Sequence, residues 1–189
     1  MIKEDDSITN LSKKELMRKV VTLETIQDLT FLNQAMQETL RFQNPAAANT
    51  PVYFTKEGGT LGKYKVDTTT EIAIIFHALH TNAKQWQRPH EFLPERFDKE
   101  SPLYLTPDGK KRHPFAFAGF NGGKRVCFGK TFAEATIKIV VTYLTAYFNF
   151  EHVDVEYRDK NNYPLAHFGI GGKRPPVFMT LTPNDTFKD

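Results

Sequence analysis

The segment from Thr81 to Pro114 constrains the fold more than any other part of the chain, because it is rich in proline. Proline lacks a backbone N–H and has a fixed φ, so neither a long helix nor a central strand can pass through this segment. An irregular segment of this length inside a compact domain is usually functional or wraps around a scaffold. We therefore predict an ordered, irregular meander over residues 81–119. Its prolines are Pro89, Pro94, Pro102, Pro107 and Pro114.

Helices are predicted on the N-terminal side of the meander, over residues 7–43. Apolar residues recur at helical spacing in LSKKELMRKVVTLETI and again in LTFLNQAMQETLRF, with charged residues on the other faces. The second helix should end at Asn44, because the residue before a proline disfavours the α region. Short β-prone runs follow, VYFT, TLGKYKV and EIAIIFHAL, with Gly58 and Gly59 between two of them. They predict a β-region over residues 51–80.

Two further elements are predicted on the C-terminal side of the meander. Residues 130–149 form a strongly apolar helical pattern, which predicts a buried helix. Residues 150–183 alternate like an edge strand, turn at a glycine pair and close with a second β-prone run. This pattern predicts a C-terminal β-hairpin.

Composition excludes several classes of protein. The chain has 189 residues, of which 40% are hydrophobic and 25% charged, which is ordinary globular usage rather than that of a disordered or collagen-like chain. Its 25 Lys and Arg against 22 Asp and Glu leave a net charge of +3, too close to balance to indicate a nucleic-acid partner. No apolar run approaches the roughly 20 residues of a spanning helix, and the acidic start MIKEDDSITN is unlike a signal peptide.

The single cysteine, Cys127, lies between a glycine-bearing loop and the start of the apolar helix. One cysteine forms no disulfide within the chain and builds no Cys-rich zinc site. Unpaired amides, the positive end of the helix and the neighbours Lys124 and Arg125 favour a thiolate there. Gly122 and Gly123 let the backbone approach a large, flat group, and the pattern suits a thiolate that ligates a metal in an aromatic pocket. Two phenylalanines could wall this pocket, Phe120 and Phe128.

Three other interpretations of the loop stay open. A lone cysteine is often a buried structural residue. The run Gly129-Lys130-Thr131 ends like a phosphate-binding loop, although five residues separate Gly123 from Gly129 where a Walker A loop has four. A catalytic cysteine with a histidine base has no local signature here.

His77 and His80 stand three residues apart and could be imagined as a zinc pair. The segment is predicted as strand and turn rather than helix, and no third ligand is close in the sequence. We therefore do not expect a zinc site at these two histidines.

The run Phe120–Gly129 resembles the haem-binding loop of the cytochrome P450 family, whose pattern is F-x-x-G-x-R-x-C-x-G. All five fixed positions of the pattern match, and Ala133 fits the helix that follows the loop in that family. Two further motifs precede it in the family's order: Glu38-x-x-Arg41, and FLPERF, which contains Arg96. The fold that this resemblance implies is mainly α with small β-sheets (α+β).

The resemblance implies haem b as cofactor. Cys127, as a thiolate, would be the proximal ligand of the haem iron, and thiolate donation favours O–O cleavage. Arg125 would pair with a haem propionate, and Phe120 would lie against the ring near the sulfur. The resemblance assigns the remaining motif positions to cofactor binding as well: Gly123, Gly129 and Ala133.

The resemblance also implies a buried structural triad of Glu38, Arg41 and Arg96. Each arginine carries a planar donor fork, so the Glu38 carboxylate could accept paired hydrogen bonds between them. Such a triad is costly unless every group is satisfied, and it would hold the meander beneath the cysteine loop. Without the resemblance, Glu38 and Arg41 would be interpreted as a solvated i,i+3 ion pair.

The function that the resemblance implies is that of a haem-thiolate monooxygenase, which inserts one oxygen atom from O2 into a small, hydrophobic organic substrate. Electrons would come from NADPH through a reductase docked on the proximal face, where Lys124 and Lys130 could meet an acidic partner. No nucleic-acid partner is expected. A eukaryotic parent protein would associate with the endoplasmic-reticulum membrane.

Members of the family are more than twice as long as this chain. The central helix of the oxygen site, with its [AG]-G-x-[DE]-T motif, has no counterpart in the sequence. We therefore expect residues 1–189 to be a single partial domain, the C-terminal, proximal part of the fold, with residues 120–129 as the haem loop. We expect the chain alone to be inactive. The alternatives are a truncated, non-catalytic haem-binding module or gene-model fragment and, more remotely, a P-loop-like nucleotide binder.

Overall fold

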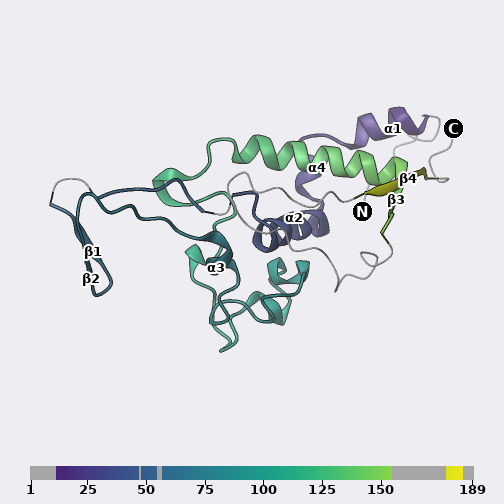
Figure 1. Cartoon of the computed structure of the whole chain (residues 1–189). Coiled ribbons are helices and arrows are strands. Elements are labelled where there is room, and N and C mark those ends of the chain that lie inside the picture. The colour runs from purple at the N-terminus through teal and green to yellow at the C-terminus, as the bar shows by residue number, and fades with distance from the viewer. Residues whose placement is uncertain (1–11, 47, 55–56, 155–177, 185–189) are drawn as a thin grey trace. The chain divides into compact units, whose positions relative to one another are not determined.

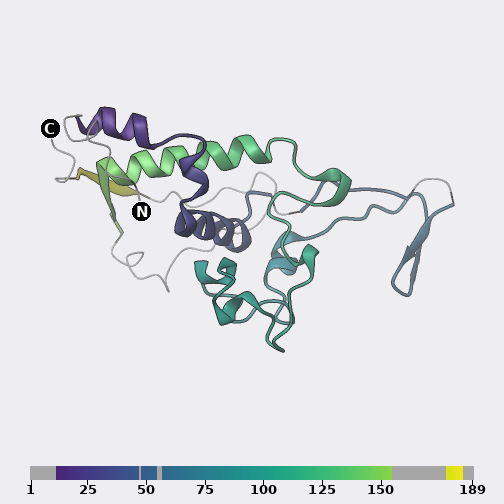
Figure 2. The ribbon, with the colours of Figure 1, turned by 180° about the vertical axis from the view of Figure 1, so that it is seen from behind.

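The computed structural model describes residues 12–46, 48–54, 57–154 and 178–184 (Figures 1 and 2). These residues form two compact units. The helical unit comprises the described residues up to Asn33 together with those from Cys127 onward, and the meander unit runs from Gln34 to Val126. Each unit is described by itself. No helix in the described ranges is both long and apolar enough to cross a membrane.

The helical unit contains α1 (Lys13–Val20), the 3₁₀ turn η2 (Thr25–Gln27) and the long helix α4 (Lys130–Tyr147). A capping box starts α1: Ser12 Oγ accepts from the Glu15 amide at 3.3 Å, and Glu15 Oε2 accepts from the Ser12 amide at 3.0 Å. Strand β3 (Phe148–His152) follows α4 and pairs antiparallel with β4 (Met179–Pro183). The rest of the expected C-terminal hairpin, residues 155–177, lies outside the described residues.

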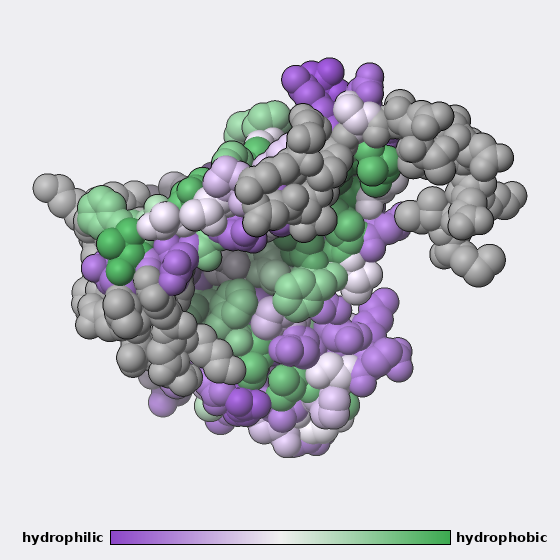
Figure 3. Space-filling view, turned by 90° about the vertical axis from the view of Figure 1, so that its right-hand side faces the viewer, coloured by the Kyte–Doolittle hydropathy of each residue, from purple (hydrophilic) through white to green (hydrophobic). Residues whose placement is uncertain are grey.

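Helix α4 is not the buried helix that its composition predicts, and it ends at Tyr147 rather than at residue 149. Phe132 is 77% exposed and Val140 47%, whereas Lys138 is the one buried residue of the helix within the described chain. Lys138 donates to Gln27 Oε1 of η2 at 3.0 Å. The partners that the helical unit supplies are a three-residue turn and an eight-residue helix, which are too small to cover eighteen residues. Hydrophobic residues appear green on the face shown in Figure 3, and large hydrophobic side chains of both units are exposed.

The meander unit begins with most of α2 (Thr30–Phe42), which ends just before Asn44. A short antiparallel hairpin follows, made of β1 (Gly59–Leu61) and β2 (Tyr64–Val66), and isolated bridges pair Val52 with Ile72 and Ala48 with Ile75. These pairings form a β-region, as the sequence predicts, but only as far as Ile75.

Residues Phe76–His80 form a short helix, α3, where a β-prone run was predicted. Among the described residues, the Ala48–Ile75 bridge is the last pairing of this segment. From there on the backbone amides are satisfied within helical turns, because the Leu79 and Thr81 amides donate to the carbonyl oxygens of Ile75 and His77.

The meander, residues 81–119, contains neither an α-helix nor a strand longer than a single bridge. It is organised as a series of 3₁₀ turns, η3 (Pro94–Phe97), η4 (Pro102–Tyr104) and η5 (Pro114–Ala116). Each of the three begins with a proline. Proline suits that first position because its missing N–H would be unpaired there and its φ is already helical. The prolines therefore shape the meander rather than merely interrupt it.

The β1–β2 hairpin offers a matched pair of glycine substitutions. Gly58 and Gly62 both have positive φ, at 83° and 58°, so alanine at either position adds backbone strain of about 1–2 kcal/mol. Only at Gly58 would the new Cβ also meet backbone, 2.4 Å from the Val66 carbonyl oxygen; nothing lies within 4 Å at Gly62. We expect Gly58→Ala to accelerate amide hydrogen exchange across the hairpin much more than Gly62→Ala. Equal acceleration would show that the close approach to Val66 is unimportant.

Candidate functional site

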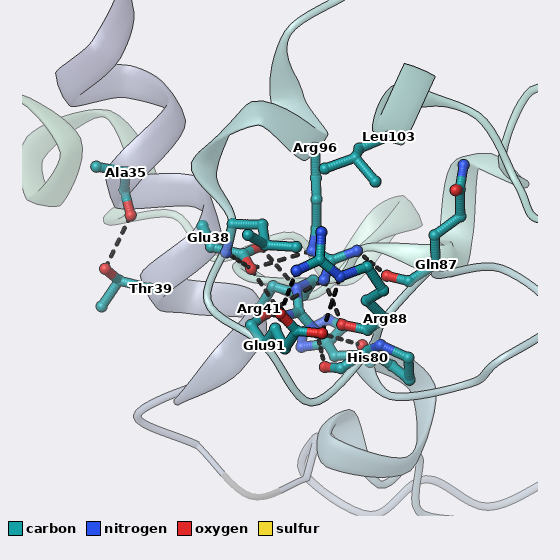
Figure 4. A network of polar contacts seen from close by, with 12 residues as sticks. Ala35, Glu38, Thr39, Arg41, His80, Gln87, Arg88, Glu91, Arg96 and Leu103 are labelled. Carbon is teal, nitrogen blue, oxygen red and sulfur yellow. Dashed lines mark hydrogen bonds and ion pairs between the residues drawn. The ribbon is translucent and has the colours of Figure 1, made fainter. Parts of the chain in front are cut away.

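Three fully buried charged side chains form the centre of the meander unit (Figure 4). Arg41 grips the Glu38 carboxylate with two bonds, Nε to Oε2 at 2.7 Å and Nη2 to Oε1 at 2.8 Å. Arg96, from the PERF turn η3, donates from Nε to Glu38 Oε1 at 3.2 Å. The exposed fraction is 0% for Glu38, 1% for Arg41 and 0% for Arg96. The structure thus brings together the three residues named in the sequence, as a buried cluster rather than a solvated i,i+3 pair.

The remaining donors of the two arginines are satisfied by backbone carbonyls of the meander and of α3. Arg41 donates to the carbonyl oxygens of His80 at 2.9 Å, Pro89 at 2.8 Å and Glu91 at 3.0 Å. Arg96 donates to the carbonyl oxygens of Gln87, Arg88 and Glu91, and the Leu93 amide donates to Glu38 Oε1 at 2.8 Å. Burial lowers the pKa of Arg96, and the Glu38 charge opposes this shift. A buried ionic cluster is tolerated when its groups are hydrogen-bonded, and every guanidinium nitrogen of these two arginines has at least one partner.

Arg112 and Trp86 extend this core, and sequence reasoning missed both. The Arg112 guanidinium lies 4.4 Å from the Trp86 ring centroid and 5.3 Å from that of Tyr104. It donates to the carbonyl oxygens of Leu103, at 2.8 Å, and Arg96. Burial is the main cause that lowers the pKa of Arg112 to about 10. The sequence carried no local signal for this contact, because Arg112 and Trp86 stand near opposite ends of the meander segment.

His80, the last residue of α3, is completely buried beside the charged cluster. Its Nε2 accepts a hydrogen bond from the Ala118 amide at 3.0 Å. Burial, followed by the charge of Arg41, lowers the pKa of His80 to about 4. Nε2 of His80 is thus engaged, whereas its Nδ1 is buried without a hydrogen-bond partner. The described ranges contain no cluster of three potential metal ligands from His, Cys, Asp or Glu.

The cysteine loop runs across the division between the two units. Phe120, Gly123 and Arg125 belong to the meander unit, whereas Cys127, Gly129 and Ala133 belong to the helical unit. Asn44, just after α2, donates from Nδ2 to the Gly119 carbonyl oxygen at 3.1 Å. This hydrogen bond holds the residues that lead into the loop. Gly123–Arg125 forms a 3₁₀ turn that begins with positive φ at Gly123, 58°. Such a backbone favours glycine at this position.

The Cys127 thiol is free and exposed at the entrance to α4. Gly129 caps this helix, and a Cβ at that position would stand 3.8 Å from Cys127 Sγ. The flanking side chains are apolar and uncovered: Val126 is 50% exposed and Phe128 fully exposed. The interpretation of Cys127 as a buried structural cysteine is therefore wrong.

Comparison with known proteins decides the family. The family model for cytochrome P450 matches residues 9–178. The chain belongs to the cytochrome P450 family. Cytochrome P450 4V2 of Mus musculus is 35% identical over 123 residues, which are 64% of this chain and 21% of that protein. The cytochrome P450 monooxygenase prhB of Penicillium brasilianum is 30% identical over 87% of this chain and 32% of its own length.

Solved P450 structures share the fold. The haem domain of cytochrome P450DA superimposes with a TM-score of 0.69 at 22% identity, over 86% of this chain and 33% of that chain. A retinoic acid-bound cyanobacterial P450, CYP120A1, gives 0.64 at 20% identity over 90% of this chain and 39% of its own. The expected class, mainly α with small β-sheets, is confirmed. The chain spans about a fifth to a third of the length of the curated P450 relatives described above.

The charged cluster predicts a large difference between two glutamates that each pair with an arginine three residues away. Glu38→Gln should lower the free energy of unfolding by about 3–5 kcal/mol, because it leaves two guanidinium groups buried without their anion. Glu91→Gln is the matched control. Its ion pair with Arg88 is about half exposed and screened by water, so the loss should be far smaller. Urea denaturation measures both; equal losses would contradict the prediction.

The buried His80 predicts a specific loss of stability in acid. Its pKa of about 4 in the folded chain lies below the ordinary value of 6.5, so the unfolded chain binds the additional proton between these values. Its contribution is complete above pH 6.5 and is lost as the pH falls toward 4, by about 3 kcal/mol. His80→Phe should remove this part of the pH dependence. Denaturant titrations between pH 4 and pH 7 measure it, and parallel curves for both proteins would contradict it.

Proposed function

We propose that this chain is the haem-binding part of a haem-thiolate monooxygenase and that Cys127 is the ligand of the haem iron. The observation that carries the proposal is the exposed Cys127 thiol at the start of α4, within a loop that matches all five fixed positions of the P450 pattern. An exposed thiolate at a helix N-terminus is a suitable iron ligand.

The residues around Cys127 fit a large, flat, partly apolar group. Val126 and Phe128 present uncovered apolar surface on both sides of the cysteine in the chain. A Cβ at Gly122 would stand 2.8 Å from the Phe115 ring, so the present position of the ring favours glycine there. At Gly129 a Cβ would be in ordinary van der Waals contact with the sulfur, at 3.8 Å. The donor set of one thiolate suits haem iron, which takes its other equatorial ligands from the porphyrin.

Each remaining loop residue then has a proposed role. The exposed Arg125 guanidinium would bind a propionate carboxylate, and Phe120 would lie against the porphyrin ring. The positive φ of Gly123 would turn the chain toward the cofactor. Ala133 would keep the first turns of α4 narrow. The bound haem would supply the chemistry that inserts one atom of O2 into an organic substrate.

Electron supply and substrate belong to the whole protein. We propose NADPH as electron source through a reductase, which would dock where the exposed Lys124 and Lys130 flank the cysteine. The proposed substrate is a small hydrophobic molecule, and a eukaryotic parent protein would associate with the endoplasmic-reticulum membrane. Since the chain spans about a fifth to a third of its P450 relatives, we further propose that the chain alone does not turn over substrate. The competing function is a haem-binding module without catalysis.

Substitution of Cys127 tests the iron ligand directly. The purified chain is titrated with haem, reduced and exposed to carbon monoxide. We expect a red-shifted Soret band of the thiolate type in the wild-type chain and in the control variant Lys124→Ala, and its loss in Cys127→Ala. The control removes a loop charge without touching the sulfur. An unchanged spectrum in Cys127→Ala would refute the ligand assignment.

Turnover separates the two functions. The haem-loaded chain, supplied with NADPH and a reductase, should oxidise no test substrate above the haem-only background, whereas the Soret signature persists. Product formation that depends on Cys127 would show that the chain is an enzyme by itself. If the chain neither binds haem nor turns over substrate, the competing function as a haem-binding module is contradicted as well.

A further inference from the structure

We propose that the pocket between α1 and the C-terminal part of α4 binds a flat aromatic carboxylate. The pocket has a volume of about 450 Å³, which is within the usual range for small-molecule sites. Helix α1 contributes Lys14 and Arg18 to its lining, and α4 contributes Tyr143 and Tyr147. Both helices belong to the helical unit, and α1 lies beside the C-terminal part of α4 in both views of the chain (Figures 1 and 2).

Two cations from one side of α1 form the first wall of the pocket. Lys14 and Arg18 stand four residues apart, so one helical turn separates them on the same face. Both residues are exposed, and no ion pair among the described residues includes either of them. Within the described chain the two charges are therefore available to an anionic group. The planar donor fork of Arg18 matches the geometry of a carboxylate.

The only carboxylate of α1, that of Glu15, is engaged at the start of the helix. Its Oε2 accepts from the Ser12 hydroxyl at 2.8 Å and from the Ser12 amide at 3.0 Å. These hydrogen bonds are the first causes that lower the pKa of Glu15, and the charge of Arg18 is the last. The capping box thus directs this carboxylate to Ser12 rather than to the cations of the pocket.

Two parallel phenol rings form the second wall. Tyr143 and Tyr147 are also one helical turn apart, with ring centroids at 6.3 Å and ring planes that differ by 5°. Both residues are half-buried. Parallel rings present a flat, apolar surface on which a further aromatic ring packs in an offset arrangement.

The two walls together define the class of ligand. Cations alone take any small anion, and aromatic rings alone take any flat apolar molecule. A rigid ligand that carries a carboxylate on an aromatic ring contacts both walls at once. The pocket is separate from the cysteine loop, because Lys130 and Tyr143 are about 20 Å apart along the axis of α4. Binding there is therefore independent of the proposed iron ligand.

A pocket of similar size in the meander unit serves as the control. Its volume is about 500 Å³, and Lys84, Lys110 and Lys111 line it without any aromatic residue. Lys110 is already paired with Asp108 at 2.7 Å. This control pocket offers positive charge but no flat apolar wall, so a flat aromatic carboxylate should not prefer it.

Two probes of the same shape test the class of ligand in the haem-free chain. 2-Naphthoate carries the carboxylate, and 2-naphthamide is its neutral counterpart. In an NMR titration, 2-naphthoate should shift the signals of α1 and of the two tyrosines saturably, with a dissociation constant of about 1 mM or lower. 2-Naphthamide should bind at least about tenfold more weakly. Equal binding of the two probes overturns the proposal, and so does a titration without saturation.

Inorganic phosphate tests the contribution of the rings. It carries the charge without a flat body, so it should bind at least about fivefold more weakly than 2-naphthoate. Phosphate that binds as tightly as 2-naphthoate shows a site for small anions in general and overturns the assignment to an aromatic ligand.

Variants of each wall locate the site. Lys14→Gln and Arg18→Gln should each raise the dissociation constant of 2-naphthoate by about threefold to tenfold. Lys84→Gln makes the same chemical change in the control pocket and should leave it unchanged. Tyr143→Leu should raise it by about fivefold, whereas Tyr143→Phe keeps the ring and should bind like wild type.

The variant series has two outcomes that overturn the proposal. One is a Lys84→Gln variant that weakens binding as much as Lys14→Gln, because the probe then binds elsewhere. The other is a Tyr143→Leu variant that binds as tightly as Tyr143→Phe, because the ring then makes no contribution. Lys14 and Arg18 are exposed, so their substitution should preserve the fold, and unchanged amide shifts outside the pocket verify this. Failure of the iron-ligand assignment is separate, because it appears as a Cys127→Ala spectrum identical to wild type.

Discussion

The Glu38 carboxylate, buried between two arginines, is the interaction on which the meander unit depends. Its oxygens accept from Arg41, from Arg96 and from the Leu93 amide, and the arginines then reach the carbonyl oxygens of α3 and the meander. A segment with only short 3₁₀ turns and single bridges leaves some of its backbone carbonyls without a backbone partner. Here the two guanidinium groups take the place of a neighbouring strand for carbonyls that would otherwise be unpaired.

The cluster also orders the segment of the meander unit that precedes the cysteine loop. Arg112 and its aromatic neighbours pack beside Arg96 in the interior of this unit. Two side-chain contacts then reach the end of the meander: His80 accepts from the Ala118 amide, and Asn44 donates to the Gly119 carbonyl oxygen. Hydrogen bonds to the interior of the unit thus hold the residues just before the loop.

Part of this could be predicted from residue types alone, and part only from the family resemblance. The prolines indicate the meander by themselves. The buried cluster was predicted only because Glu38-x-x-Arg41 and PERF resemble family motifs, since the residue types alone indicate a solvated ion pair. The prediction that α4 is buried was wrong. An apolar helical pattern indicates that a helix has a hydrophobic face, but it does not indicate which element packs against that face. The prediction of a strand that includes Phe76 was also wrong. Strand pairing depends on the partner segment, and the last bridge among the described residues joins Ala48 to Ile75. Arg112 escaped notice because cation–π contacts have no fixed spacing in sequence.

The reach of the ion pairs has a consequence for the order of folding. Arg96 meets Glu38 across 58 positions of the chain, whereas Arg41 meets it within a single turn of α2. Helix α2 can therefore form early with its own pair still in water, but the carboxylate can leave water only when the distant arginine arrives. Closure of the chain between Glu38 and Arg96 and removal of water from the charged cluster must therefore occur together. The meander should gain its structure in one cooperative step, and partially folded forms with only one arginine docked should be sparsely populated.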